Sequence, residues 1–314
     1  MKRFFILASA AIVALASCAK TEVVNNSGPQ EIAFKQLTGP MTKAEQTQAT
    51  LSGDMGVYAL INNSQTNDFY FQNHQFTLKD GQTYWTGTNL YWPLSGSLDF
   101  VVYAPYAAIS NALPHYHPAN NTLRVKVDNS GKTSINDQTD YLYGEKVYRA
   151  YDKYTDHVDV TLKHALAKVT VSFTGTHVKV SNVTLPSVYL SGTYTVDYDN
   201  EDEEMMSWEN YGQPASITLI SPNTGDNGQT PVFTPLDGTT QSASILVVPN
   251  NASTITFQYK LGDNDTAMNY EITPNGVWKS GIHYTYSVNI DPKEIKIEPT
   301  VDTEWATGGD TFNL

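Results

Sequence analysis

The 314-residue chain contains a single cysteine, Cys18, so neither a disulfide within the chain nor a multi-cysteine metal site can form. Basic residues are also scarce: 19 lysines and arginines stand against 32 acidic residues, which gives a net charge of −13. This acidity argues against binding to nucleic acid and against electrostatic adhesion to anionic lipid. Without disulfides, the folded chain must rely on packing of apolar side chains.

Motifs of common enzyme classes are missing too. The sequence has no glycine-rich phosphate loop and no Gly-x-Ser-x-Gly nucleophile elbow. His115 and His117 could share one face of a strand, but no further metal ligands accompany them, and a solvated loop that ends at Pro118 is the preferred interpretation. His164 is expected to be a buried, hydrogen-bonded histidine. We therefore predict a protein that is not an enzyme and that binds neither a cofactor nor a metal.

Outside the first residues, no segment sustains the long amphipathic period of a helix. Short apolar-rich segments alternate instead with clusters of Gly, Asn, Asp and Pro, which indicates many short strands arranged in sandwiches or barrels. The predicted strands are residues 56–61, 69–78, 98–106, 122–127, 139–144, 178–185, 188–196, 215–220, 244–249, 254–261, 268–273 and 283–290.

The stretch at residues 158–173, VDVTLKHALAKVTVSF, lies near the middle of the chain. Its apolar side chains fall on even positions up to Leu162 and on odd positions from Ala167. Because side chains alternate between the two faces of a strand, this change of parity sends the apolar row to the opposite face. We interpret the change as the place where one strand ends the core of a first domain and the next opens the core of a second. A single helix is the alternative, which the β-branched residues after Lys168 disfavour.

The first residues predict export. A basic pair precedes an apolar run at residues 4–15 that is too short for a stable membrane span. The run leads into LASC at residues 15–18, which resembles the bacterial lipobox, in which a cysteine is lipidated and becomes the mature N-terminus. We therefore predict a lipoprotein signal peptide at residues 1–17 and lipidation of Cys18. An ordinary signal peptide with an incidental cysteine is the alternative.

Residues 31–37, EIAFKQL, follow a polar tether at residues 18–30. Ile32 and Phe34 fall on one face of this segment, which predicts a short first strand. If both side chains are fully enclosed, each contributes roughly 1.5–3 kcal/mol of burial. A β-domain that lacked this strand would expose backbone donors and apolar side chains unless a partner added a strand.

The next segment, residues 38–50, is polar and is interrupted by Gly39 and Pro40. It predicts an exposed loop, the kind of segment in which proteolysis concentrates. Lys43 is its only basic residue, so we predict that processing occurs between Lys43 and Ala44.

The tail at residues 294–314 alternates regularly. From 295 to 305 its apolar side chains fall on odd positions, and every even position between them is polar. A donor strand needs this pattern, because it presents anchors to one face and polar side chains to solvent. Pro299 divides the tail into two short segments. The tail could instead complete the sheet of its own domain. The predicted anchors are Ile295, Ile297, Val301 and Trp305.

Several of these pieces together resemble the fimbrillin family, the Mfa-like subunits of type V pili. The resemblance rests on the lipobox, EIAF followed by TKA, WPLSGSLDFVVYAPY, TDYLYG, VTLKHALAKVTVSF, and WKSGIHYTYSVNI followed by IKI and Trp305. It implies an all-β fold of two tandem transthyretin-like Greek-key β-sandwich domains, here at residues 31–162 and 163–293. It also implies display on the outer membrane as a lipid-anchored precursor.

The resemblance further implies a structural pilus subunit that supports adhesion. In this family a trypsin-like protease cuts after the first strand, typically after arginine, and the C-terminal strand of another subunit fills the groove. Here Lys43 takes the place of that arginine. The expected partners are other pilus subunits, the processing protease and the outer membrane, which the precursor reaches through the lipid on Cys18.

Two alternatives to a polymerising subunit remain. One is an uncleaved fimbrial anchor, accessory or tip lipoprotein. The other is a surface glycan-binding lipoprotein that uses exposed aromatic side chains, although packing within the sheets is the preferred interpretation of these residues. The candidate aromatics are Tyr84, Trp85, Tyr91 and Trp92.

Overall fold

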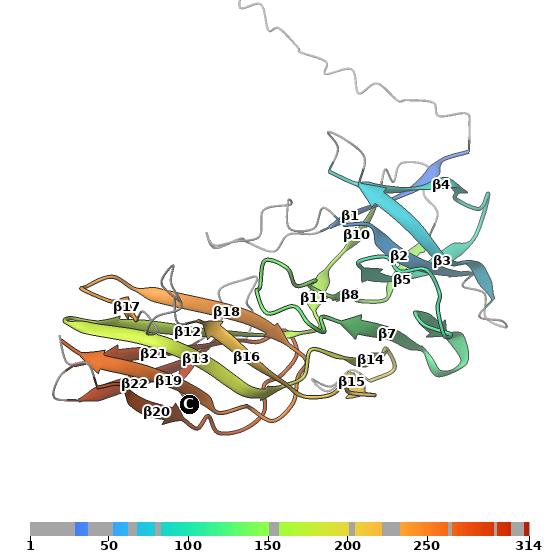
Figure 1. Ribbon diagram of the computed structural model, residues 1–314. Coiled ribbons are helices and arrows are strands. Elements are labelled where there is room, and N and C mark those ends of the chain that lie inside the picture. Colours follow the sequence, from blue (N-terminus) through green and yellow to red (C-terminus); the bar gives the residue numbers. More distant parts are fainter. Residues whose placement is uncertain are drawn as a thin grey trace, which may run out of the picture.

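A computed structural model of the chain describes residues 29–36, 53–61, 68–78, 83–150, 157–200, 205–221, 233–262, 266–291, 294–302 and 311–313. These residues form strands, turns and one short 3-10 helix, Pro118–Asn120, and they contain no α-helix. The strands build four sheets (Figure 1), which confirms the all-β fold predicted from the sequence. Within the described ranges, no helix has the length and apolar composition needed to cross a membrane.

The largest sheet belongs to the N-terminal half of the chain and has nine strands, in the order β10-β1-β4-β3-β2-β5-β8-β11, with β9 beside β5. Its two edges meet, because β10 and β11 are consecutive in the chain and only Thr161 separates them. The sheet is thereby curled around an apolar interior. Its strands are β1 (Glu31–Gln36), β2 (Met55–Ile61), β3 (Phe69–Leu78), β4 (Trp85–Tyr91), β5 (Ser97–Ala104), β8 (Leu142–Gly144), β9 (Val147–Ala150), β10 (Val158–Val160) and β11 (Leu162–His164).

The central strands β2 and β5 are buried on both faces, which explains their continuous apolar sequences. In β5, Phe100 and Val102 point into the curled sheet, where they contact residues of β1 and β10. Val101 and Tyr103 point the other way, into a second core. Because successive side chains of a strand alternate between its faces, a strand between two cores needs apolar residues at every position.

A four-stranded sheet, in the order β15-β14-β7-β6, covers the outer face of β2 and β5 and forms the second core with it. Its β7 comes from the first half of the chain and its β14 from the second, and they pair along their whole lengths. Figure 1 shows this sheet below the nine-stranded sheet and beside the C-terminal strands. The boundary between two domains at residues 162 and 163 stays a prediction. The strands are β6 (His115–His117), β7 (Thr122–Asp128), β14 (Ser191–Asp197) and β15 (Met206–Glu209).

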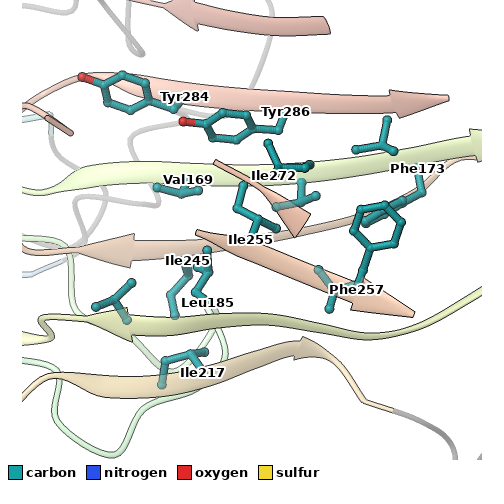
Figure 2. Packing of buried hydrophobic residues seen from close by; sticks show 14 of the residues in the cluster. Val169, Phe173, Leu185, Ile217, Ile245, Ile255, Phe257, Ile272, Tyr284 and Tyr286 are labelled. Atoms are coloured by element: carbon teal, nitrogen blue, oxygen red, sulfur yellow. The ribbon is translucent and has the colours of Figure 1, made fainter. Parts of the chain in front are cut away.

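Two five-stranded sheets form the C-terminal sandwich, one in the order β18-β12-β21-β22-β23 and one in the order β16-β13-β19-β20 with β17 beside β13. Figure 2 shows their shared core, in which Phe173 of β12 meets Phe257 of β19, with ring centroids 5.0 Å apart. The strands are β12 (Ala167–Gly175), β13 (Val178–Val188), β16 (Ala215–Ile220), β17 (Thr234–Pro235), β18 (Gln241–Val247), β19 (Ile255–Leu261), β20 (Met268–Ile272), β21 (His283–Ile290), β22 (Ile295–Asp302) and β23 (Thr311–Asn313).

The parity change at residues 158–173 separates cores, as the sequence predicted. Val158 and Val160 face the interior of the curled sheet, whereas Val169 and Phe173 face the C-terminal core. Ala165 and Leu166, which lie between them, belong to the second core. The stretch therefore forms strands and not a helix, as predicted, although it contains three strands, β10, β11 and β12, where two were expected.

His164, the last residue of β11, is buried at 6% exposure, and its Nδ1 lies 2.6 Å from Oδ2 of Asp140. The sequence-based expectation of a hydrogen-bonded core histidine is confirmed at this position.

Candidate strand-exchange site

The first strand, β1, lies in the interior of the nine-stranded sheet. It runs antiparallel to β4, with Phe34 opposite Trp85, and parallel to β10, with Phe34 opposite Val158. Both edges of β1 therefore have a neighbouring strand. If β1 were removed, β4 and β10 would each present unpaired backbone groups to the space between them.

Two apolar side chains attach β1 to the interior of the sheet. Ile32 and Phe34, the predicted residues of the displaced strand, are both 0% exposed and belong to the same core. The ring of Phe34 makes edge-to-face contacts with Phe76, at a centroid distance of 4.9 Å, and with Phe100, at 5.1 Å. Such aromatic pairs add to the stabilisation that burial alone provides.

The C-terminal end of β1 fits the sheet less well. Gln36 follows Phe34 by two positions, so its side chain turns toward the same inner face. Its Oε1 is buried and has no hydrogen-bond partner among the described residues. An unpaired buried polar group costs roughly 1–3 kcal/mol. Ile32 and Phe34 thus stabilise β1, whereas Oε1 of Gln36 forms no hydrogen bond with the described residues.

The predicted processing site lies outside the described residues, as do Cys18, Lys43 and Ala44. β1 ends at Gln36, and the next described residue is Gly53. Any backbone cut between these two residues would separate β1 covalently from the rest of the chain.

The predicted donor tail forms β22 and pairs antiparallel with β21 of its own domain, from Ile295 opposite Ile290 to Asp302 opposite His283. The strand runs through Pro299, which lies opposite Tyr286, so the predicted division into two short segments is wrong. Val301 is 7% exposed, and Ile295 and Ile297 are half-buried against the C-terminal core. In this structure the tail therefore completes the sheet of its own domain, one of the two possibilities that the sequence left open. Trp305 lies outside the described residues.

The alternation of the tail appears in the structure as two faces. Val301 and the two half-buried isoleucines point to the core, whereas Lys296 and Glu298 point outward and form an exposed ion pair. The hydrogen bond and the negative charge of Glu298 raise the pKa of Lys296. One row of the strand can therefore bind an apolar surface while the other row stays in solvent.

The tryptophans proposed for sugar binding belong to the core. Trp85 and Trp92 are 1% and 6% exposed, and Nε1 of Trp85 donates a hydrogen bond to the carbonyl oxygen of Gly53 at 3.1 Å. Tyr84 and Tyr91 are half-buried. A sugar-binding platform needs exposed aromatic rings, and the two largest candidates are not available for it.

The two neighbouring histidines lie on β6, a strand, where a loop was the preferred interpretation. The correction follows from pairing with β7, in which His115 lies opposite Arg124 and His117 opposite Thr122. Burial, together with the charges of His117 and Arg124, lowers the pKa of His115. Over the described ranges, no cluster of three or more His, Cys, Asp or Glu residues is placed to hold a metal ion.

Comparison with known proteins gives one family and several similar folds. The model of the family described as fimbrillin-like matches residues 42–305. The fold is similar to that of a fimbrial protein from Bacteroides vulgatus, with 16% identity and a TM-score of 0.56 over 87% of this chain and 99% of that chain. It is also similar to a candidate cell adhesion protein from Bacteroides uniformis, with 17% identity and a TM-score of 0.54 over 88% of this chain and 99% of that chain. Among curated proteins, no sequence matches the chain.

Proposed function

We propose, from the premise that this chain belongs to the fimbrillin-like family, that it is a structural pilus subunit that assembles by exchange of strands between molecules. The observation that carries the proposal is the position of β1. It is a buried, interior strand, and residues 37–52 are its only covalent link to the rest of the fold.

The acceptor in this proposal is the groove between β4 and β10. Its walls offer backbone donors and acceptors from two strands, and its floor is the apolar surface that Ile32 and Phe34 cover. A strand from another molecule would satisfy both walls and the floor together, which is the usual form of recognition by strand addition. Loss of β1 without replacement would leave an aggregation-prone gap in the sheet.

The donor in this proposal is β22. It follows the last long strand of the sandwich, and its neighbours are β21 along its full length and β23 at three residue pairs. Its departure leaves the order β18-β12-β21 of the sheet intact. The apolar row that now packs on its own domain is also the row that an acceptor groove would bind, so self-binding and exchange are mutually exclusive states of one segment.

Family membership places the protein at the cell surface with other pilus subunits as partners. We propose that the lipid on Cys18 holds the precursor at the outer membrane and that cleavage at Lys43–Ala44 releases it from that anchor. The lipid, the tether and β1 would then be lost together, because all of them precede the cut. Release from the membrane and opening of the groove would be a single event.

A second candidate is an uncleaved fimbrial anchor. The observation that favours it is that this chain fills its own sheets, since β1 occupies the acceptor groove and β22 completes the C-terminal sandwich. Such a subunit would keep its lipid on Cys18 and end a pilus at the membrane.

N-terminal sequencing of protein taken from the cell surface separates the two functions. A polymerising subunit should begin at Ala44 and form ladders that resist SDS, and Lys43→Gln should abolish both. Lys35→Gln is the matched control, because Lys35 is exposed on β1 and its loss should change neither result. Mature protein that begins at a lipidated Cys18 and forms no ladder would favour the anchor.

A further inference from the structure

A cavity of about 260 Å³ lies near the end of β1, because its lining includes Trp85, the partner of Phe34 on β4, and Leu162, which follows β10 by two residues. The apolar part of its lining comes from β2, β4, β5, β8 and β11 and from the residue after β5. These residues are Met55, Trp85, Ala104, Leu142, Leu162 and Pro105. A cavity of this size accommodates a whole apolar side chain, since a cavity of roughly 150 Å³ already binds benzene.

Strand register places the cavity at the next side-chain position of the groove. In the parallel ladder of β1 and β10, Phe34 lies opposite Val158 and Gln36 opposite Val160. A strand that continued in this register would place its next inward-facing residue opposite Leu162, because inward side chains recur every second residue. Leu162 lines the cavity. β1 ends at Gln36, one inward position short of it.

The polar residues on the cavity lining are bound to the body of the protein. The side chain of Gln138 accepts a hydrogen bond from the backbone N–H of Leu246, at 2.7 Å, and donates one to its carbonyl oxygen, at 2.8 Å. Oδ2 of Asp140 is paired with His164, whereas its Oδ1 is buried without a hydrogen-bond partner among the described residues. The cavity therefore offers an incoming strand a mainly apolar surface with one unpaired carboxylate oxygen on it.

We propose that this cavity is the pocket that sets the register of an incoming strand, and that Val301 of a second copy of this chain fills it. The inference rests on the proposed strand exchange. Ile295 and Ile297 have the same spacing as Ile32 and Phe34, and β22 would enter in the direction in which β1 runs. Aligned in this way, Val301 lies opposite Leu162.

The same alignment removes the weakest feature of β1. Pro299 takes the place of Gln36, whose buried oxygen is unpaired among the described residues. The incoming strand then offers apolar residues at four successive inward positions, whereas β1 offers Ile32 and Phe34 followed by a glutamine. Exchange would therefore replace a glutamine with a proline at one inward position and would place Val301 at the next, beside the cavity.

Leu162→Trp tests the pocket by filling it from the acceptor side. The matched control is Thr161→Trp, since Thr161 is the adjacent residue and is exposed on the opposite face. Burial of one valine side chain raises the equilibrium constant for strand binding roughly tenfold or more. Leu162→Trp should therefore reduce the amount of polymer on the cell surface by about that factor. Thr161→Trp should polymerise like the unchanged protein. Equal polymer from both variants would overturn the inference.

A cysteine pair keeps the inference testable if Leu162→Trp disturbs folding. Leu162→Cys combined with Val301→Cys should give SDS-resistant ladders that become covalent and separate only with reductant. Leu162→Cys with Thr300→Cys should give ladders without covalent links, because residue 300 faces away from the groove in this register. The variants with only one of these substitutions show whether Cys18 forms any of the covalent links. Covalent links with residue 300, or ladders without links at residue 301, would refute the register. Absence of ladders from the unchanged protein would instead refute strand exchange itself.

Discussion

Phe34→Ala should destabilise the uncleaved precursor and leave the assembled pilus unaffected. The side chain is fully buried and contacts two aromatic rings at centroid distances of 4.9 and 5.1 Å. Truncation of a buried phenylalanine to alanine costs about 3–5 kcal/mol, and the two ring contacts favour the upper part of this range. Since whole domains are stable by only about 5–15 kcal/mol, the loss is a large fraction of the total.

The assay is thermal unfolding of soluble precursor, which carries Cys18→Ala to remove the lipid and Lys43→Gln to prevent cleavage. A change of 1 kcal/mol moves the midpoint of a domain of this size by about 2–4 °C, so the N-terminal transition should fall by roughly 6–20 °C. The C-terminal transition should stay where it was. Lys35→Ala, on the exposed face of the same strand, should move neither transition, because exposed substitutions change stability by about 0.5 kcal/mol or less.

The second half of this prediction concerns chains that have been cleaved and assembled. If β1 has been replaced by a strand of another subunit, Phe34 is absent from the pilus, and polymer from the Phe34→Ala strain should dissociate in hot SDS at the normal temperature. An unshifted precursor would refute the role of Phe34 in holding β1. Polymer weakened as much as the precursor would show that β1 stays in place, and strand exchange would be refuted.

Three further outcomes are expected. Deletion of residues 294–314 should lower the melting midpoint of the C-terminal transition alone, because Val301 is buried and two isoleucines are half-buried there. The free energy of unfolding should fall by about 3–5 kcal/mol. An unchanged midpoint would contradict the packing of β22. Cys18→Ala should abolish acyl labelling and retention at the outer membrane, and normal incorporation of labelled fatty acid would argue against the lipobox. Burial raises the pKa of Tyr143 from its usual value near 10 to about 12. The stabilisation that depends on the protonated Tyr143 hydroxyl is fully present below about pH 10 and is lost as the pH rises to about 12. The urea midpoint of unfolding should therefore fall across this window, and it should fall less steeply for Tyr143→Phe.

Local patterns in the sequence predicted much of the strand content. Residues 283–290 were predicted as a strand and form β21 with the same bounds, and the first strand ends one residue earlier than predicted. These segments alternate strictly or are strongly apolar. β9 was missed because its four residues, VYRA, are mostly exposed and carry no such alternation.

Long-range pairing was harder to predict. Residues 191–197 return to the N-terminal half and pair with residues 122–128, although the sequence between them opens a second sandwich. Neither segment contains a signal for its partner, because a strand pattern specifies which faces are buried and not which strand lies beside it. The cavity next to β1 was unpredictable for the same reason, since its lining comes from strands far apart in the chain.

The closure of the curled sheet by residues 158–164 has a mechanical consequence. If a donor strand binds beside β10 and is pulled along its own axis, the force acts parallel to both strands. The hydrogen bonds between the donor strand and β10 are then loaded together in shear and are not broken one after another. The same segment continues through Ala165 and Leu166 into β12, which lies between β18 and β21 in the C-terminal sandwich. Tension applied at the groove therefore reaches the second core through a few residues of continuous backbone. A fibre built in this way would carry force from subunit to subunit without passing it through a long, flexible connection.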